Sequence, residues 1–180
     1  MGGTCVLVVS PKAKERLMQT LRPAPYSLDL TRAVKFADEF QTVNTPNTTA
    51  IWLAYQAAHW MNGHGGIPTM DALCRQHAAW LLDWAANTDF IRPLVAEEKF
   101  RSYTTLTLQL TDPTIKPDDI NQALADTGLG NLQDGIKRHP YAPENTLRVA
   151  CFPFVDPNGI EEYKKLTAAL DQIVQQLRKR

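Results

Sequence analysis

One arginine near the C-terminal end of the sequence has neighbours that would hold it on a strand. Arg148 lies in the run 147–152, where alternation places it on one face with Ala150 and Phe152 and leaves the intervening apolar residues on the other. A guanidinium among such neighbours needs an anion, because burying it unpaired is costly. Its planar fork fits a carboxylate through two parallel hydrogen bonds. Arg148 is therefore a candidate carboxylate-binding residue, and the alternative is a structural salt bridge or an exposed sheet face.

Two further segments could bind anions. Asn44-Thr45-Pro46 precedes an apolar, helix-like segment, and free backbone N–H groups and the positive dipole end at a helix start attract anions. Lys137-Arg138-His139-Pro140 is a compact cationic turn that could bind a phosphate or a carboxylate. The alternatives are plain helix capping for the first segment and a solvated loop for the second.

The sequence shows no catalytic motif beside these groups. His59 and His64 are five residues apart, which is not a recognised metal-ligand spacing, and no carboxylate or cysteine cluster supports them. His77 lies on an apolar helical stripe, which is typical of a hydrogen-bonded core histidine. The glycine-rich turn at 63–66 lacks the strand-then-helix context of a phosphate-binding loop, and nucleophile-elbow and zinc motifs are absent.

The elements that would position these residues differ between the two halves of the chain. The β-branched run 5–9 predicts a strand covered on both faces, and Ser10-Pro11 predicts a helix start. A connection with a short helix near 31–40 follows. Next come a helix at 45–61, apolar nearly all round and so expected to be buried, and an amphipathic helix at about 68–86.

The second half predicts a small α/β module. Strict alternation at 102–110 indicates a half-buried strand, 117–126 a short helix, and the stretches near 132–137 and 147–152 two more strands. Asp156 and Pro157 then cap a long amphipathic helix. Strand, helix, strand, strand and helix predict a two-layer α/β (α+β) fold with helices on one face of a mainly antiparallel sheet.

Composition limits the function classes. The 180 residues carry 19 basic and 19 acidic side chains, which argues against a nucleic-acid partner. No apolar run approaches the roughly 20 residues of a membrane span, and the N-terminus does not resemble a signal peptide. Cys5, Cys74 and Cys151 are widely spaced in apolar contexts and are expected to be reduced, buried thiols, so we expect a cytoplasmic protein without a metal site.

In order along the chain, these motifs resemble the C-terminal portion of the phosphoserine aminotransferases, which are class V, fold type I pyridoxal-phosphate enzymes. The resemblance covers essentially the whole chain. Asn44-Thr45-Pro46 is its most specific motif, followed by the segment Ser10 to Leu17. The remaining motifs that carry it are Val6 to Val9, Gly65-Gly66 with the tryptophan-rich helix, Phe100-Arg101-Ser102, Asp112-Pro113, Gly135 to Arg138 and Leu147-Arg148-Val149.

The resemblance implies roles for individual residues. Arg148 would hold the substrate α-carboxylate, and Asn44 and Thr45 would contact the phosphate of pyridoxal 5'-phosphate across a homodimer interface. Arg138 and His139 would help to bind the substrate phosphate, although a local insertion at 141–145 makes that alignment loose. The partners implied are a small amino-acid or keto-acid substrate and a second copy of the chain. Residues 1–43 would be a remnant of the large domain, 44–92 a helical segment and 93–180 the C-terminal small domain.

One family feature is missing from the matching motifs. The lysine that holds the cofactor as an imine would lie just upstream of the strand expected at 5–9, and none of Lys12, Lys14 or Lys35 stands in the corresponding motif. Because transamination needs that lysine, we expect no catalytic residue in this chain and no activity from the chain alone. Two alternatives stay open: another class V aminotransferase, such as a serine– or alanine–glyoxylate enzyme, and a non-catalytic dimerisation module.

Overall fold

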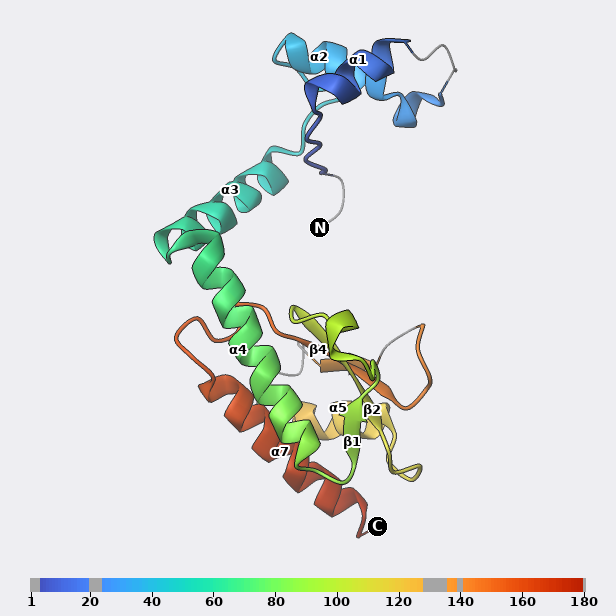
Figure 1. Ribbon diagram of the computed structural model, residues 1–180, viewed down its shortest axis with the longest axis vertical. Coiled ribbons are helices and arrows are strands. Elements are labelled where there is room, and N and C mark those ends of the chain that lie inside the picture. Colours follow the sequence, from blue (N-terminus) through green and yellow to red (C-terminus); the bar gives the residue numbers. More distant parts are fainter. Residues whose placement is uncertain (1–3, 20–23, 128–135, 139–140, 180) are drawn as a thin grey trace. The chain divides into compact units, whose positions relative to one another are not determined.

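The computed structural model describes residues 4–19, 24–127, 136–138 and 141–179 (Figure 1). The chain divides into two compact units, Met1–Trp60 and Met61–Arg180.

The first unit contains short helices, and its α-helices at 11–19 and 30–38 each begin at a side-chain cap. Ser10 Oγ accepts a hydrogen bond from Ala13 N (3.2 Å), and Asp29 Oδ1 accepts one from Thr31 N (3.0 Å). Such caps satisfy N–H groups that lack an intrahelical partner, and the one at Ser10 confirms the predicted helix start. Lys14 Nζ pairs with Asp38 at 2.6 Å. The elements are α1 (Pro11–Gln19), the 3₁₀ helix η1 (Tyr26–Leu28) and α2 (Leu30–Asp38).

The strand expected at residues 5–9 is not formed. These residues have no regular secondary structure, and Val6 and Val8 are 82% and 91% exposed. A strand needs a neighbouring strand to pair its backbone groups, and no other strand is found among the described residues of this unit. Local β-propensity alone therefore did not determine the structure of this segment.

Helix α3 (Thr48–Gly63) begins three residues later than the sequence predicts, because Asn47 rather than Thr45 caps it: Asn47 Oδ1 accepts from Ala50 N at 3.0 Å. The expectation that this helix is buried is also wrong. None of its residues is buried, and Trp52 and Tyr55 are 57% and 62% exposed.

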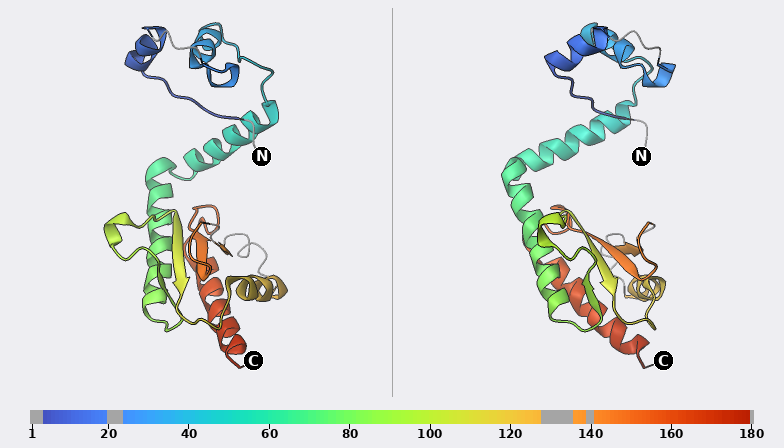
Figure 2. Two further views of the ribbon diagram at one scale, coloured as in Figure 1. Left: turned by 90° about the vertical axis from the view of Figure 1, so that its right-hand side faces the viewer. Right: turned by 45° about the vertical axis from the view of Figure 1, so that its right-hand side comes forward.

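The second unit is a two-layer α/β structure, as the sequence predicts (Figure 2). Its strands lie in the order β1-β2-β4-β3, and every neighbouring pair is antiparallel. Helices α4, α5 and α7 pack on one face of this sheet. The elements are α4 (Gly66–Ala86), β1 (Ile91–Pro93), η2 (Glu98–Phe100), β2 (Thr105–Leu110), α5 (Pro117–Asp126), β3 (Ile136–Arg138), β4 (Thr146–Ala150) and α7 (Glu161–Leu177).

Alternation along the strands separates the core from the opposite face of the sheet. In β2, Leu106, Leu108 and Leu110 are at most 3% exposed, while the residues between them are half-buried. Leu147 and Val149 of β4 are buried in the same way. The helices complete this core with Leu81 of α4, Ile120 and Leu124 of α5, and Tyr163, Leu166, Leu170 and Val174 of α7. Among the described residues, no helix is long and apolar enough to cross a bilayer.

Arg178, just after α7, joins two turns that are distant in sequence. Its Nε lies 3.0 Å from Asp112 Oδ2, and its side chain lies 3.1 Å from Asp89. Asp112 Oδ1 accepts further hydrogen bonds from Thr114 N (3.0 Å) and Thr114 Oγ1 (2.6 Å). These contacts fix the turn between β2 and α5.

The Asp112 carboxylate should make stability fall at acidic pH. Hydrogen bonds from Thr114, and then from Arg178, lower the pKa of Asp112 below its ordinary value of 3.8. A group with a lowered folded-state pKa contributes its full stability above that ordinary value and loses it as the pH falls through the folded-state pKa. Urea unfolding at pH 6 and at pH 3 should show a smaller acid-dependent loss for Asp112→Asn than for the unmodified chain. An equal loss in both would contradict this assignment.

Candidate functional site

Arg148 lies in the middle of β4, on the sheet face that the helices leave open. It is exposed, whereas Leu147 and Val149 on either side are buried. Its register partners are Thr107 on β2 and Lys137 on β3. No hydrogen bond or ion pair joins Arg148 to another residue in the described part of the chain. The guanidinium is therefore neither locked to an internal carboxylate nor buried, so its five donors are accessible to a ligand.

The open face around Arg148 is cationic. Arg92 and Lys137 lie on it too, and none of the described residues in the four strands is acidic. Arg92 donates to Gln109 Oε1 from Nε (3.3 Å) and Nη2 (3.1 Å), and is thus held by a neutral amide. Because the chain as a whole carries no net charge, the absence of acids from the described residues of these strands is a local feature that favours an anion.

The structure describes only part of the predicted basic turn. Arg138 is the last residue of β3 and lies in register with Leu147. The Arg138 side chain and the whole of His139 lie outside what the structure describes, so their predicted contact with a phosphate stays a prediction. Lys137, which the sequence analysis placed in the basic turn without a role of its own, is the residue in register with Arg148. Only the strand register reveals this pairing, and the sequence gives no direct signal for it.

Asn44 and Thr45 lie in the segment that precedes α3 and are exposed. They line an open hollow that Phe36, Phe40 and residues 41–46 form. The backbone carbonyl of Asn44 accepts a hydrogen bond from Thr42 Oγ1 at 2.6 Å. Since α3 begins only at Thr48, these residues are not its capping residues, and the expectation that they stand at the helix start is wrong.

The chemistry of this hollow fits the edge of a phosphate site. The amide of Asn44 and the hydroxyl of Thr45 can donate hydrogen bonds to phosphate oxygens. No lysine or arginine lines the hollow. Its described residues could therefore orient a phosphate, while groups elsewhere would have to neutralise the charge.

His77 is a fully buried core histidine, as predicted. Its Nε2 lies 2.8 Å from Gly159 O and 3.1 Å from Asp156 O, so the tautomer with a hydrogen on Nε2 donates to the loop between β4 and α7. Its ring stacks on Tyr163 with a centroid distance of 4.5 Å. Asp156 Oδ2 accepts a hydrogen bond from Glu162 N in the first turn of α7 at 2.9 Å. Because α7 begins only at Glu161 and its N-cap residue is Ile160, the expectation that Asp156 and Pro157 cap this helix is wrong. His77 therefore holds the loop that follows the strand bearing Arg148.

The three cysteines are free thiols, but only two are buried. Cys74 and Cys151 lie in the core, and burial raises the pKa of Cys151 to about 12. Cys5 is exposed, so the expectation of burial is wrong for this residue. No group of three potential metal ligands occurs among the described residues.

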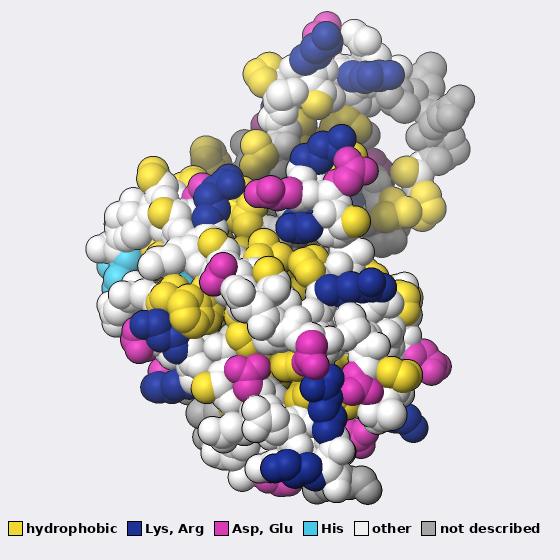
Figure 3. Space-filling view, turned by 60° about the horizontal axis from the view of Figure 1, so that its bottom comes forward, with side chains coloured by type: hydrophobic (Ala, Val, Ile, Leu, Met, Phe, Trp, Pro, Cys, Tyr) yellow, Lys and Arg dark blue, Asp and Glu magenta, His cyan; other side chains and the backbone are white. Residues whose placement is uncertain are grey.

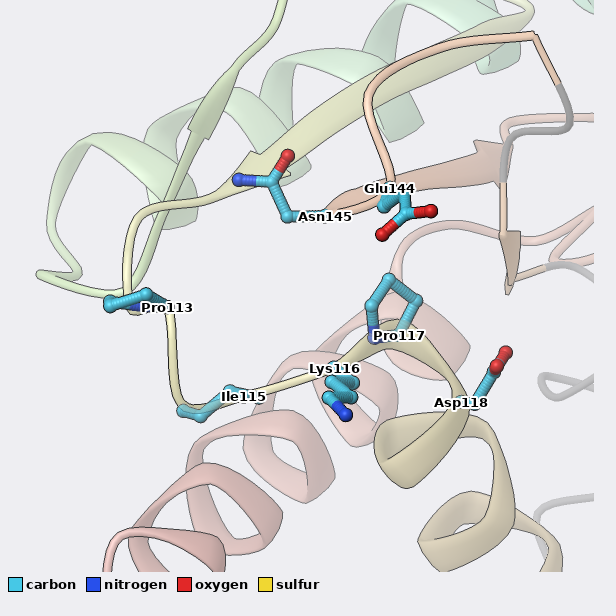
Figure 4. Close-up of a pocket in the computed structure, with 7 residues that line it drawn as sticks. All are labelled: Pro113, Ile115, Lys116, Pro117, Asp118, Glu144 and Asn145. Atoms are coloured by element: carbon cyan, nitrogen blue, oxygen red, sulfur yellow. The ribbon is translucent and has the colours of Figure 1, made fainter.

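A separate cavity of about 240 Å³ lies between the turn before α5 and the turn before β4 (Figure 4). Lys116, Asp118 and Glu144 give its lining charges of both signs, and Arg148 does not border it. The surface in Figure 3 likewise shows basic and acidic side chains interspersed. Because this cavity is lined by charges of both signs, we place the candidate anion-binding site on the open sheet face instead.

Comparisons with known proteins agree with the fold and motifs, although no family model matches the chain. The chain is 30% identical over 181 residues to a phosphoserine aminotransferase of Rhodococcus opacus and 31% identical to a putative phosphoserine aminotransferase of Mycobacterium avium. Each alignment covers 98% of this chain and 46% of the relative. A phosphoserine aminotransferase structure from Cytophaga hutchinsonii matches 89% of the chain and 41% of its own, with a TM-score of 0.70 and 22% identity.

These similarities show that the chain has a fold like that of one part of an aminotransferase. The chain spans about half the length of the curated relatives that it matches (46%). More particularly, it is homologous to the C-terminal portion of phosphoserine aminotransferases, which confirms the resemblance inferred from its motifs.

Proposed function

We propose that this chain is the C-terminal part of a longer pyridoxal-phosphate-dependent aminotransferase that exchanges the amino group between phosphoserine and 2-oxoglutarate, and so acts in serine biosynthesis in the cytoplasm. The observation that carries the proposal is Arg148, an exposed guanidinium without a partner among the described residues, on a strand face without acids. The homologues named phosphoserine aminotransferase support the reaction class.

In this proposal each candidate residue has a binding task. Arg148 holds the substrate α-carboxylate through its two-pronged fork and thereby orients the amino group for reaction. Asn44 and Thr45 donate hydrogen bonds to the cofactor phosphate of the partner subunit in a homodimer. Arg138 and His139 assist in binding the substrate phosphate. When bound, the cofactor supplies an electron sink for proton transfer at the substrate Cα.

The lysine that would bind the cofactor covalently lies outside this chain in the proposal. Lys14 is engaged with Asp38, and neither Lys12 nor Lys35 stands in the corresponding motif. The chain alone therefore contributes substrate and cofactor contacts without the residue that moves the proton.

The exposed side of α3 favours association with a second copy of the chain. Ile51, Trp52 and Tyr55 are each about half exposed or more, and exposed clusters of this kind mark interaction surfaces. This surface also fits the second candidate function, a non-catalytic dimerisation module. Light scattering on the purified chain tests the surface, and a strictly monomeric chain would count against both roles.

An activity assay on two proteins tests the proposed function. The purified 180-residue chain and the longer protein with its upstream segment would each receive pyridoxal phosphate, phosphoserine and 2-oxoglutarate. We expect glutamate formation from the longer protein and none from the chain alone. Activity of the chain alone would refute the missing-lysine argument. Activity of the longer protein with serine or alanine but not with phosphoserine would refute the substrate and favour a glyoxylate-type enzyme.

A further inference from the structure

We propose that Lys137 and Arg148 act together as a binding site for a small molecule that carries two negative charges, and that such a ligand fastens the edge strand β3 to β4. The inference rests on the proposed role of Arg148 in holding an anion. It adds Lys137, for which the sequence suggested no individual role, and a coupling between ligand binding and strand pairing.

The strand register brings the two cations together. Lys137 and Arg148 are direct partners across the antiparallel pair β3–β4. Directly opposite residues have Cβ atoms about 4.5–5.5 Å apart and project on the same face of the sheet. Both side chains are exposed, and neither has a hydrogen bond or ion pair within the described ranges. Thr107, which flanks Arg148 on the other side, brings a hydroxyl and no charge.

The neighbouring cations Lys137 and Arg148 lower the stability of the sheet unless an anion binds between them. Like charges directly opposite each other on a sheet repel. Elsewhere in this unit, several exposed cations have acidic neighbours: Arg75 pairs with Asp71 at 2.8 Å and Lys164 with Glu161 at 2.7 Å. The four strands offer no acid among their described residues. A bound anion is therefore the available source of compensation on this face.

The pair favours a dianion over a monoanion. The guanidinium fork of Arg148 accommodates one carboxylate or two phosphate oxygens, and the ammonium of Lys137 offers a second point charge one strand away. A dicarboxylate or a phosphomonoester can engage both cations, whereas a monocarboxylate satisfies one. Because β3 has only three residues and pairs with β4 alone, a ligand that bridges both strands would protect its amides from exchange.

Titrations of the 180-residue chain, followed by NMR amide shifts at constant ionic strength, test this inference. The probes are succinate, inorganic phosphate and, as the monoanion, propionate. We expect the dianions to bind about fivefold more tightly than propionate, and Lys137→Gln to abolish that preference. Lys137→Glu, which places a carboxylate opposite Arg148, should abolish binding of all three probes. Lys179→Gln, at an exposed lysine near the C-terminus, is the matched control and should change nothing.

The outcomes separate this inference from the proposed function. One pair of results is that Arg148→Gln loses propionate binding while Lys137→Gln keeps the preference for dianions. That pair of results would overturn the role of Lys137 and leave that of Arg148. Unchanged binding of every probe in Arg148→Gln would overturn both, as would a chain that binds no probe. Hydrogen exchange of residues 136–138 should slow with succinate and not with propionate, and equal exchange would overturn the coupling to β3. Succinate binding without phosphate binding would identify a dicarboxylate as the ligand class.

Discussion

Replacement of Arg148 by glutamine should lower kcat/KM for phosphoserine about 100-fold in the longer aminotransferase that we propose, since removing one partner of a close, desolvated charge pair costs a few kcal/mol. The substitution keeps a polar side chain of similar length on an exposed position, so the fold should be unaffected. Arg148→Lys keeps the charge but loses the planar fork, and its activity should be intermediate. Steady-state kinetics with both substrates measures the effect.

Arg92→Gln provides the control for this prediction. Arg92 lies on the same sheet face, but its guanidinium is already hydrogen-bonded to Gln109. Its replacement should change kcat/KM by no more than about twofold, as expected for a residue outside the substrate contacts. Equal losses from the Arg92 and Arg148 variants would show that only the general positive potential of the face matters, and would contradict a specific carboxylate site.

Replacement of His77 by alanine should destabilise the second unit by about 3 kcal/mol, because it opens a cavity and removes the hydrogen bonds from Nε2 to the loop carbonyl groups. The ring is fully buried, contacts Gly159 O and Asp156 O through Nε2 and stacks on Tyr163. Urea unfolding followed by tryptophan fluorescence suits the measurement, since Trp80 and Trp84 lie on the same helix.

Two further variants make the His77 prediction specific. His77→Asn retains an N–H donor that can reach toward the loop carbonyls, so it should recover part of the lost stability. His59→Ala removes an exposed histidine and should change the free energy of unfolding by less than about 0.5 kcal/mol. A loss below about 1 kcal/mol for His77→Ala would show that the loop does not depend on this side chain.

The second unit could be predicted from the sequence because its elements each bury one side. Strict alternation in 102–110 indicated a strand, of which 105–110 form β2, and the 3.6-residue period indicated α7, since both patterns report which side chains leave water. Helix α5 was predicted with the bounds that it has, because Pro117 marks its first residue. Strand β1 was missed, as three residues are too few to show a period.

Other features depend on contacts between distant segments. The run 5–9 has strong β-propensity but forms no strand, because pairing needs a second strand that the described part of this unit does not supply. The apolar composition of α3 predicted burial, yet burial depends on a covering surface. For the candidate site, alternation correctly placed Arg148 on the open face, while the position of Lys137 opposite it follows from strand register. Register depends on the whole sheet.

The different exposure of the three thiols makes the unmodified chain suitable for site-specific chemical labelling. Cys74 and Cys151 lie within the core, and the raised pKa of Cys151 leaves very little thiolate at neutral pH. A maleimide dye should therefore attach at Cys5 under native conditions and reach the other two only after denaturant is added. Such a fluorophore would report on the first unit without any engineered cysteine.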